Sequence, residues 1–192
     1  IETNVTGTTN LLELAKQIIP ERFIYVSSGS VYGEDRDPNE VLKEDAILLP
    51  RSLYESTKYA SELLTRRYGE LHGFQTASVR LSSPYGPMER VTGHRANQSV
   101  MKDFTGRVVR GEPIEVGDRS SGRDYTYVTD IAGGIRAILE APSLNFDAYN
   151  NSAGTWVTVG DIIDALQELD PNITVVDSPS TASSDLRGTS MR

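Results

Sequence analysis

Tyr54 and Lys58 stand four positions apart in the segment Ser52-Leu53-Tyr54-Glu55-Ser56-Thr57-Lys58. Residues at that spacing share one face of an α-helix, so a helix here would hold the phenol beside the ammonium. A neighbouring ammonium favours the phenolate, and the tyrosine could then exchange protons near neutral pH. The pair therefore predicts a general acid/base for a substrate hydroxyl or carbonyl. An isolated pair of this kind is also common on helix surfaces, where it does no chemistry.

The helix that carries the pair is predicted from its two ends. Ser52 and Glu55 match the capping-box pattern that begins a helix, and Gly73 is a typical residue just past a helix end. At about 100° per residue, Tyr54 and Lys58 lie on the flank of the helix, beside its core face. The core face is expected to consist of Leu53, Thr57, Ala60, Leu64 and Leu71.

Two strands are predicted to end next to this helix. Residues 22–26 form a short apolar run, which is typical of a buried parallel strand, and Ser27 and Ser28 follow it. Residues 76–81 form a second strand, which also ends in two serines. Ligands of open α/β sheets bind at the carboxyl ends of the strands. We therefore expect both strand ends and the start of the Tyr54 helix to meet at one crevice.

The order of the motifs is more specific than any one of them. Seven blocks follow one another along roughly residues 1–176. In this order the chain resembles the extended short-chain dehydrogenases/reductases, a family of NAD-dependent sugar epimerases and dehydratases. The blocks are Asn4-Val5-x-Gly7-Thr8-x-Asn10-Leu11-Leu12-Glu13, Phe23-Ile24-Tyr25-Val26-Ser27-Ser28-x-x-Val31-Tyr32-Gly33, Pro50-x-Ser52-x-Tyr54-x-x-x-Lys58, Arg80-Leu81-x-x-x-Tyr85-Gly86-Pro87, Arg110-Gly111-Glu112-Pro113-Ile114, Gly122-Arg123-Asp124-Tyr125-Thr126-Tyr127-Val128-x-Asp130 and Tyr149-Asn150.

The resemblance implies roles for the polar residues of the predicted crevice. Ser28 would hydrogen-bond the reacting oxygen, and Tyr54 would be the acid/base. Lys58 would support Tyr54 and hold the nicotinamide ribose, while Ser27, Tyr54 and Ser82 would also contact the cofactor.

Ser28 has competitors when the residues are considered without the resemblance. Ser27 and Ser30 are close enough in sequence to take its role, and Ser28 could instead satisfy backbone groups at the end of the strand.

Two further residues are implied in substrate binding. Arg123 would clamp a substrate phosphate, for which the forked guanidinium is well suited. The alternative is an ordinary surface arginine paired with Asp118 or Asp124. Ser83 stands where the family has an asparagine that binds the phosphate of a nucleotide sugar. Ser83 can still donate one hydrogen bond, so the partner is expected to be a sugar or a nucleotide sugar.

Three candidate functions are consistent with this set of residues, after a fourth, a 4,6-dehydratase, is rejected. An epimerase acting on a (nucleotide-)sugar is the leading interpretation, and an NAD-dependent sugar or sugar-acid dehydrogenase is the alternative that Ser83 favours. A 4,6-dehydratase of this family needs an acidic pair directly after the catalytic serine, where this chain has Gly29 and Ser30. We therefore reject that dehydratase. A noncatalytic nucleotide-binding module is the third candidate, and the presence of all three catalytic residue types argues against it.

The expected cofactor is NAD, with NADP left open. Dinucleotides rest on a Gly-rich first βα turn, and an acidic residue about 20 positions later binds the ribose. This chain has no G-x-x-G-x-x-G after a strand. We therefore expect a fragment that lacks about three βα units, on the order of 90 residues, and we expect enzymatic activity of the full-length parent rather than of this fragment. Its sheet would expose an edge and an apolar face.

Composition excludes several other classes. The chain has 192 residues, a net charge of −8 and no cysteine, which argues against nucleic-acid or anionic-membrane partners, disulfides and thiol catalysis. No apolar run is long enough to cross a bilayer. The only histidines, His72 and His94, lie far apart in sequence, so no metal site is expected. A cytoplasmic location is the default. A homodimer through the first helix and the Tyr54 helix is implied by the resemblance.

The predicted fold class is α/β: a partial Rossmann-like, doubly wound parallel sheet with a smaller mixed α/β substrate domain. Residues 1–83 would form the C-terminal half of the cofactor domain, to which a helix within 129–142 returns. Residues 84–128 and 143–180 would form the substrate-binding domain, and 181–192 a mobile tail. In this second half, helices are expected near 98–110, 130–140 and 158–169, and short strands at 115–116 and 125–128.

Overall fold

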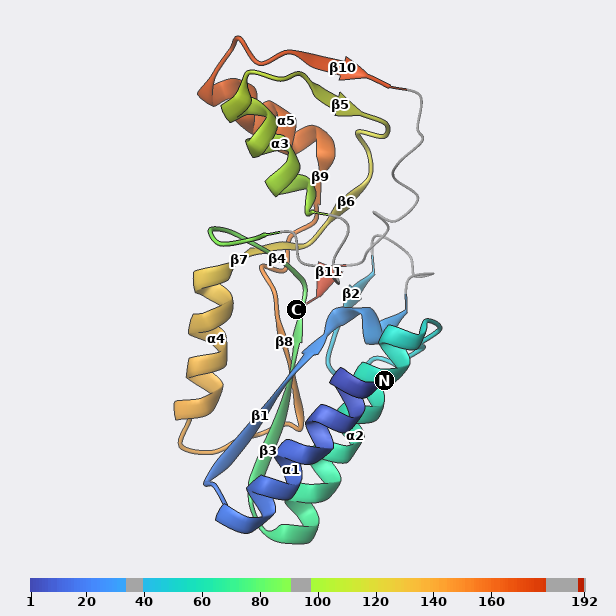
Figure 1. Cartoon of the computed structure of the whole chain (residues 1–192), viewed down its shortest axis with the longest axis vertical. Coiled ribbons are helices and arrows are strands. Elements are labelled where there is room, and N and C mark those ends of the chain that lie inside the picture. The colour runs from blue at the N-terminus through green and yellow to red at the C-terminus, as the bar shows by residue number, and fades with distance from the viewer. Residues whose placement is uncertain (34–39, 91–97, 179–189, 192) are drawn as a thin grey trace.

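A parallel sheet forms the centre of the larger part of the molecule (Figure 1), for which a computed structural model describes residues 1–33, 40–90, 98–178 and 190–191. Its strands are β1 (Arg22–Ser28), β3 (Gln75–Leu81) and β8 (Ala148–Asn151), in the order β1-β3-β8. Both pairings are parallel. In this register Ser28 lies opposite Leu81, so the two serine-rich strand ends are neighbours, as predicted.

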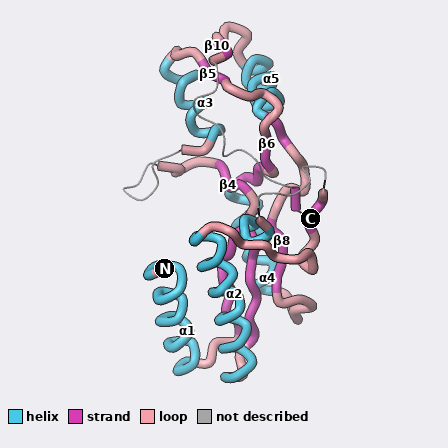
Figure 2. Tube along the Cα trace, turned by 90° about the vertical axis from the view of Figure 1, so that its right-hand side faces the viewer, coloured by secondary structure: helices cyan, strands magenta, loops and turns pink. Residues whose placement is uncertain are grey.

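Helices cover both faces of the sheet (Figures 1 and 2). One face carries α1 (Gly7–Ile18), the short π-helix η1 (Glu2–Thr6) that precedes it, and α2 (Leu53–His72). The opposite face carries α4 (Val128–Glu140), which contacts all three strands. Parallel strands buried between two helical layers define a doubly wound α/β fold and confirm the predicted fold class.

Helix α2 has the predicted ends. Ser52 and Glu55 form a complete capping box, and Gly73 ends the helix in the left-handed conformation with φ +79°.

The predicted core face of α2 is wrong at both ends, because Leu53 is 66% and Leu71 57% exposed. The buried side chains are mainly small and polar, including Thr57, Ser61 and Thr65. Two of them bond to η1: the Asn4 amide donates to Thr57 Oγ1 (3.0 Å), and Ser61 Oγ donates to the Asn4 carbonyl (2.7 Å).

The smaller part of the molecule has its own apolar core. Helices α3 (Val100–Arg110) and α5 (Val159–Leu169) pack near β5 (Ile114–Val116), which pairs in parallel with β10 (Val175–Asp177). Thr158 and Asp161 form the predicted capping box of α5. The buried residues of this core are Phe104, Ile114, Val116, Tyr125, Val159, Ile162 and Ile163.

Short strands connect the two parts (Figure 2). Strand β4 (Ser83–Tyr85) pairs in parallel with β7 (Tyr125–Tyr127), and β6 (Gly122–Arg123) pairs antiparallel with β9 (Val157–Thr158). Strand β2 (Val41–Leu42) pairs with β11 (Ser190–Met191), and the 3-10 helix η2 (Gly29–Tyr32) follows β1 directly.

Strand β8 corrects one detail of the predicted domain boundaries. It lies within 143–180, which was assigned to the substrate-binding domain, but Val79 pairs with Tyr149 and Arg80 with Asn150 in the main sheet. A strand of four residues can extend a sheet beside an existing strand, but it is too short to show a recognisable periodicity in the sequence. The domain division otherwise stays a prediction. The tail at 181–192 lies outside the described residues except for 190–191.

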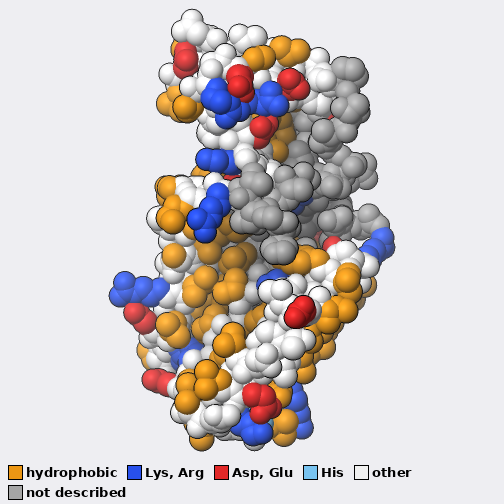
Figure 3. All heavy atoms as spheres, in the orientation of Figure 1, with side chains coloured by type: hydrophobic (Ala, Val, Ile, Leu, Met, Phe, Trp, Pro, Cys, Tyr) orange, Lys and Arg blue, Asp and Glu red, His pale blue; other side chains and the backbone are white. Residues whose placement is uncertain are grey.

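Apolar side chains are exposed over the larger part (Figure 3). In the part of the chain that the structure describes, β1 has one strand neighbour, and its Val26 is 40% exposed. Leu11, Leu14 and Ile18 on α1 and Leu63 on α2 are also exposed. The expected exposed edge and apolar face are therefore present.

The homodimer and the cytoplasmic location stay predictions. Among the described residues, no helix is both long and apolar enough to span a membrane.

Candidate active site

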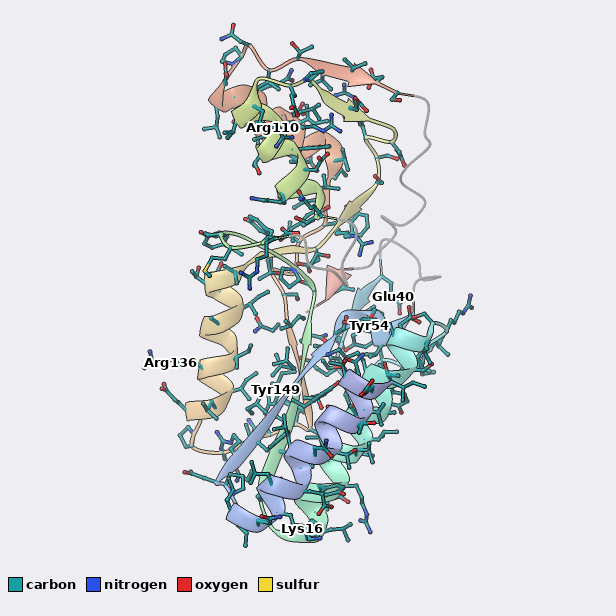
Figure 4. All side chains as sticks on the ribbon, in the orientation of Figure 1. Lys16, Glu40, Tyr54, Arg110, Arg136 and Tyr149 are labelled. Carbon is teal, nitrogen blue, oxygen red and sulfur yellow. The ribbon has the colours of Figure 1, made fainter. Side chains whose placement is uncertain are left out.

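The first two turns of α2 place Tyr54 and Lys58 side by side. Lys58 Nζ lies 6.0 Å from the centre of the Tyr54 ring, and it donates a 2.9 Å hydrogen bond to the Val26 carbonyl of β1. Tyr54 is 51% exposed and lies at the end of α2 nearest the smaller part (Figure 4). The predicted pair is therefore formed, and Lys58 fixes it to the sheet two residues before Ser28.

The environment of Lys58 acts on its charge in two directions. Burial lowers the pKa of the Lys58 ammonium, and the nearby Glu62 carboxylate opposes that shift. The ammonium also lies over the Tyr25 ring of β1, 5.2 Å from Nζ to the ring centre. Lys58 thus has two aromatic rings and one carbonyl as neighbours.

Ser28 ends β1 and also caps η2. Its Oγ accepts hydrogen bonds from the backbone N–H of Ser30 (3.3 Å) and from the Ser30 hydroxyl (2.9 Å). With two acceptor positions used, the hydroxyl of Ser28 can still donate one bond to a ligand oxygen. The two competing serines differ from Ser28. The Ser30 hydroxyl donates to Ser28, and the Ser27 Oγ is buried without a hydrogen-bond partner among the described residues.

A buried polar network holds the η2 turn after Ser28. The Tyr32 hydroxyl donates to Asn150 Oδ1 (2.8 Å) and accepts from Arg80 Nη1 (2.8 Å). Arg80 also forms two hydrogen bonds with the Glu62 carboxylate, at 3.1 and 2.9 Å. Burial raises the pKa of the Tyr32 phenol, although Arg80 opposes the shift. The Val31-Tyr32-Gly33 block therefore supports the strand end by tertiary contacts.

Ser82 and Ser83 lie at the carboxyl end of β3, next to Ser28. The Ser82 hydroxyl shares a 2.7 Å hydrogen bond with Thr126 Oγ1, so part of its capacity is used within the protein. The Ser83 backbone N–H donates to the Asp124 carbonyl (3.0 Å). The buried Asp124 carboxylate accepts from the N–H groups of residues 153 and 154. This network joins the end of the sheet to the connecting strands.

Arg123 lies apart from the sheet, on β6. Its half-buried side chain follows Gly122, where an added Cβ would approach the Val157 carbonyl oxygen to 2.5 Å. Only glycine permits this close approach of β6 to β9. The candidate counter-ions have other hydrogen bonds as well: Asp118 accepts from the N–H and hydroxyl of Ser120. The role of Arg123 in phosphate binding stays a prediction.

Sequence reasoning did not identify three parts of this site. Tyr25, Arg80 and Asp124 all lie in the motif blocks, but the sequence pattern assigns none of them a hydrogen bond or contact that supports the site. A charged residue inside a buried strand, as at Arg80, was the one available signal. For the metal prediction, no three histidine or acidic side chains come together as a possible metal site in the described ranges, and His94 lies outside them.

The fold and the site together define a class of protein. A doubly wound parallel sheet carries a serine at one strand end, and a tyrosine and lysine one helical turn apart beside it, as in short-chain dehydrogenases/reductases. Residues 1–150 match the NAD dependent epimerase/dehydratase family. The chain belongs to this family.

Several 4-epimerases of nucleotide sugars are similar to this chain. A UDP-glucuronate 4-epimerase of Thermodesulfobacterium geofontis is 34% identical over 172 residues, 88% of this chain and 50% of that protein. A UDP-glucose 4-epimerase of Thermotoga maritima, solved with UDP-glucose, is 28% identical with a TM-score of 0.83, covering 100% of this chain and 60% of that one. A UDP-glucose 4-epimerase of Thermus thermophilus, solved with NAD, is 28% identical with a TM-score of 0.82, covering 100% and 61%. The chain spans about half the length of the curated relatives it matches.

Proposed function

We propose that this chain carries the catalytic residues of an NAD-dependent epimerase that acts on a nucleotide sugar. The observation that supports this most directly is the Tyr54–Lys58 pair, which a 2.9 Å hydrogen bond ties to the strand that ends in Ser28. The names of the relatives agree, because the UDP-glucuronate and UDP-glucose enzymes are both 4-epimerases.

Residues on β1, on α2 and just after β3 fit a nicotinamide nucleotide. Among the described residues, the Ser27 hydroxyl is buried without a partner and so can bind a ligand group. Lys58 gives one of the three hydrogen bonds of its ammonium, to Val26, so it can also hold a ribose hydroxyl. The Ser82 hydroxyl keeps capacity beyond its bond to Thr126. Bound NAD would supply the acceptor and donor of a hydride.

In the proposed mechanism the protein moves one proton and holds one oxygen. Tyr54, as phenolate, accepts the proton of the sugar hydroxyl that is oxidised, and returns it when the carbonyl is reduced on its other face. Lys58 stabilises the phenolate by its positive charge. Ser28 donates a hydrogen bond to the same sugar oxygen, which holds it in reach of Tyr54. Arg123 and Ser83 are assigned to the substrate phosphates.

Two alternatives use the same residues. A dehydrogenase acting on a sugar or sugar acid would release the reduced cofactor, and the serine at position 83 favours it because one hydroxyl replaces an amide at the predicted phosphate contact. A noncatalytic nucleotide-binding module would bind without turnover.

One assay separates the three functions. A protein that contains this chain together with a glycine-rich cofactor turn is mixed with NAD and with UDP-glucose, UDP-glucuronate or free sugar acids, and both NADH absorbance and sugar composition are followed. A changed sugar without net NADH supports the epimerase, net NADH supports the dehydrogenase, and NAD binding without either supports the module.

Tyr54→Phe tests the mechanism. Removal of a general acid/base typically lowers turnover about 100-fold to 10,000-fold, so we expect at least a 100-fold loss. Tyr59→Phe on the same helix is the matched control and should retain turnover, because Tyr59 packs against an apolar cluster. Full activity of Tyr54→Phe would contradict the assignment.

A further inference from the structure

The ammonium of Lys58 is surrounded by one carbonyl and two aromatic rings. Nζ donates to the Val26 carbonyl at 2.9 Å, and it lies 5.2 Å from the centre of the Tyr25 ring and 6.0 Å from that of Tyr54. Among the described residues Lys58 forms no ion pair within 4.0 Å, and the nearby Glu62 binds Arg80. The Val26 carbonyl and the two rings are therefore contacts of this half-buried cation, and Glu62 stabilises its charge without forming an ion pair.

We propose that Tyr25 is a positioning residue for the acid/base pair: the face of its ring binds the Lys58 ammonium and holds it beside Tyr54. A cation over the face of an aromatic ring is attracted by the ring quadrupole when it lies within about 6 Å of the centre. The Tyr25 ring meets this condition more closely than the Tyr54 ring does. The inference rests on the proposed function, in which Lys58 supports Tyr54.

The ring of Tyr25, rather than its hydroxyl, carries this role. Tyr25 is 8% exposed, and its hydroxyl is buried without a hydrogen-bond partner among the described residues. Burial raises the pKa of the Tyr25 phenol, so the group remains neutral near pH 7 and does not exchange protons with Lys58.

The charged groups around Lys58 are the same in all variants of Tyr25. On α2 itself, Glu62 raises the pKa of Lys58, while burial lowers it. On β3, Arg80 neutralises Glu62 by two hydrogen bonds. On β1, Tyr25 and the Val26 carbonyl face the ammonium. A change confined to the Tyr25 ring therefore tests one partner of the cation.

The experiment measures the titration of Lys58 without using catalysis. The chain has four lysines, Lys16, Lys43, Lys58 and Lys102, so trace acetylation at a series of pH values, followed by peptide mass spectrometry, reports each of them separately. Lys16 and Lys102 serve as internal controls. The variants are Tyr25→Phe and the same position carrying mono-, di- and trifluorinated phenylalanine. Fluorine weakens the negative ring face while shape and burial change little.

We expect Tyr25→Phe to leave the apparent pKa of Lys58 within about 0.3 units, because the ring remains. Successive fluorination should lower it stepwise, by about half a unit to one and a half units in total, as the charged form loses stabilisation. Lys58 would then be acetylated at lower pH, with unchanged titration of Lys16 and Lys102.

Two results would overturn the role of Tyr25: a Lys58 titration unaffected by fluorination, or a shift in Tyr25→Phe as large as in the trifluorinated variant, which would assign the effect to the hydroxyl. The outcome is separate from that of the proposed function, because acetylation needs no substrate. A stepwise shift together with full activity of Tyr54→Phe would retain the cation contact and reject the catalytic assignment.

Discussion

Replacing Arg80 by methionine removes the cation of the buried ion pair that supports the turn after Ser28. The Arg80 and Glu62 side chains are 6% and 7% exposed, and they are joined by two hydrogen bonds. Arg80 also donates to the Tyr32 hydroxyl (2.8 Å) and to the Glu44 carbonyl (3.0 Å). Methionine fills a similar volume but makes none of these bonds.

The expected loss follows from this burial. Breaking a buried pair by removing one partner typically costs about 3–5 kcal/mol, because the remaining charge is left without compensation. For a chain of this length each kcal/mol corresponds to roughly 2–4 °C, so the midpoint of thermal unfolding should fall by about 6–20 °C. A loss of that size is a large part of the stability of a typical domain.

Denaturant unfolding with linear extrapolation measures the free energy of unfolding of each variant. Arg66→Met is the matched control: Arg66 pairs with Glu70 and Asp147 at 3.9 and 3.8 Å with about half of its side chain exposed, so its replacement should cost at most about 1 kcal/mol. The double variant Arg80→Met with Glu62→Met should be more stable than Arg80→Met alone, because no buried charge is left unpaired.

The reasoning would be refuted if Arg80→Met cost no more than Arg66→Met. It would also be refuted if adding Glu62→Met lowered the stability further by its full single-variant cost, since the two residues would then act independently.

Two further predictions concern stability. Gly69→Ala on α2 should cost about 1–3 kcal/mol, because its Cβ would lie 2.6 Å from Thr76 Cγ2, whereas Gly133→Ala on α4, with no atom within 4 Å, should stabilise by about 0.5–1 kcal/mol; equal effects in urea unfolding would reject this contrast. Burial opposes ionisation of Glu55, but N–H donors at 51–52 outweigh it and lower its pKa. The contribution of this carboxylate to the free energy of unfolding is present above its unfolded pKa near ~4.3 and is lost as the pH falls through its folded pKa. Glu55→Gln should therefore lower the free energy of unfolding by about 0.5–1 kcal/mol at pH 7 and by less at pH 3. A cost in urea unfolding that does not depend on pH would contradict this.

Much of the local structure was predictable because its causes lie within a few residues. Both complete capping boxes, at Ser52 and Thr158, and the helix end at Gly73 were read from short patterns. The apolar run that became β1 was also clear, because buried parallel strands are rich in apolar residues, and the strand at β3 was expected from its position before two serines and a turn. The core face of α2 was not predictable by the same rule, because Thr57 and Ser61 form hydrogen bonds there with the side chain and the backbone of Asn4 in η1.

The sequence by itself determined that a phenol and an ammonium share one helix face, because the spacing of four residues acts within a single turn. It also determined that serines follow two strands. Only the tertiary structure decided what these groups bind. Lys58 forms a hydrogen bond with Val26, which lies 32 residues away in the sequence. The hydrogen bonds of Ser82 with Thr126 and of Tyr32 with Asn150 span 44 and 118 residues. Such contacts depend on how strands and helices pack in space, and no local periodicity records them.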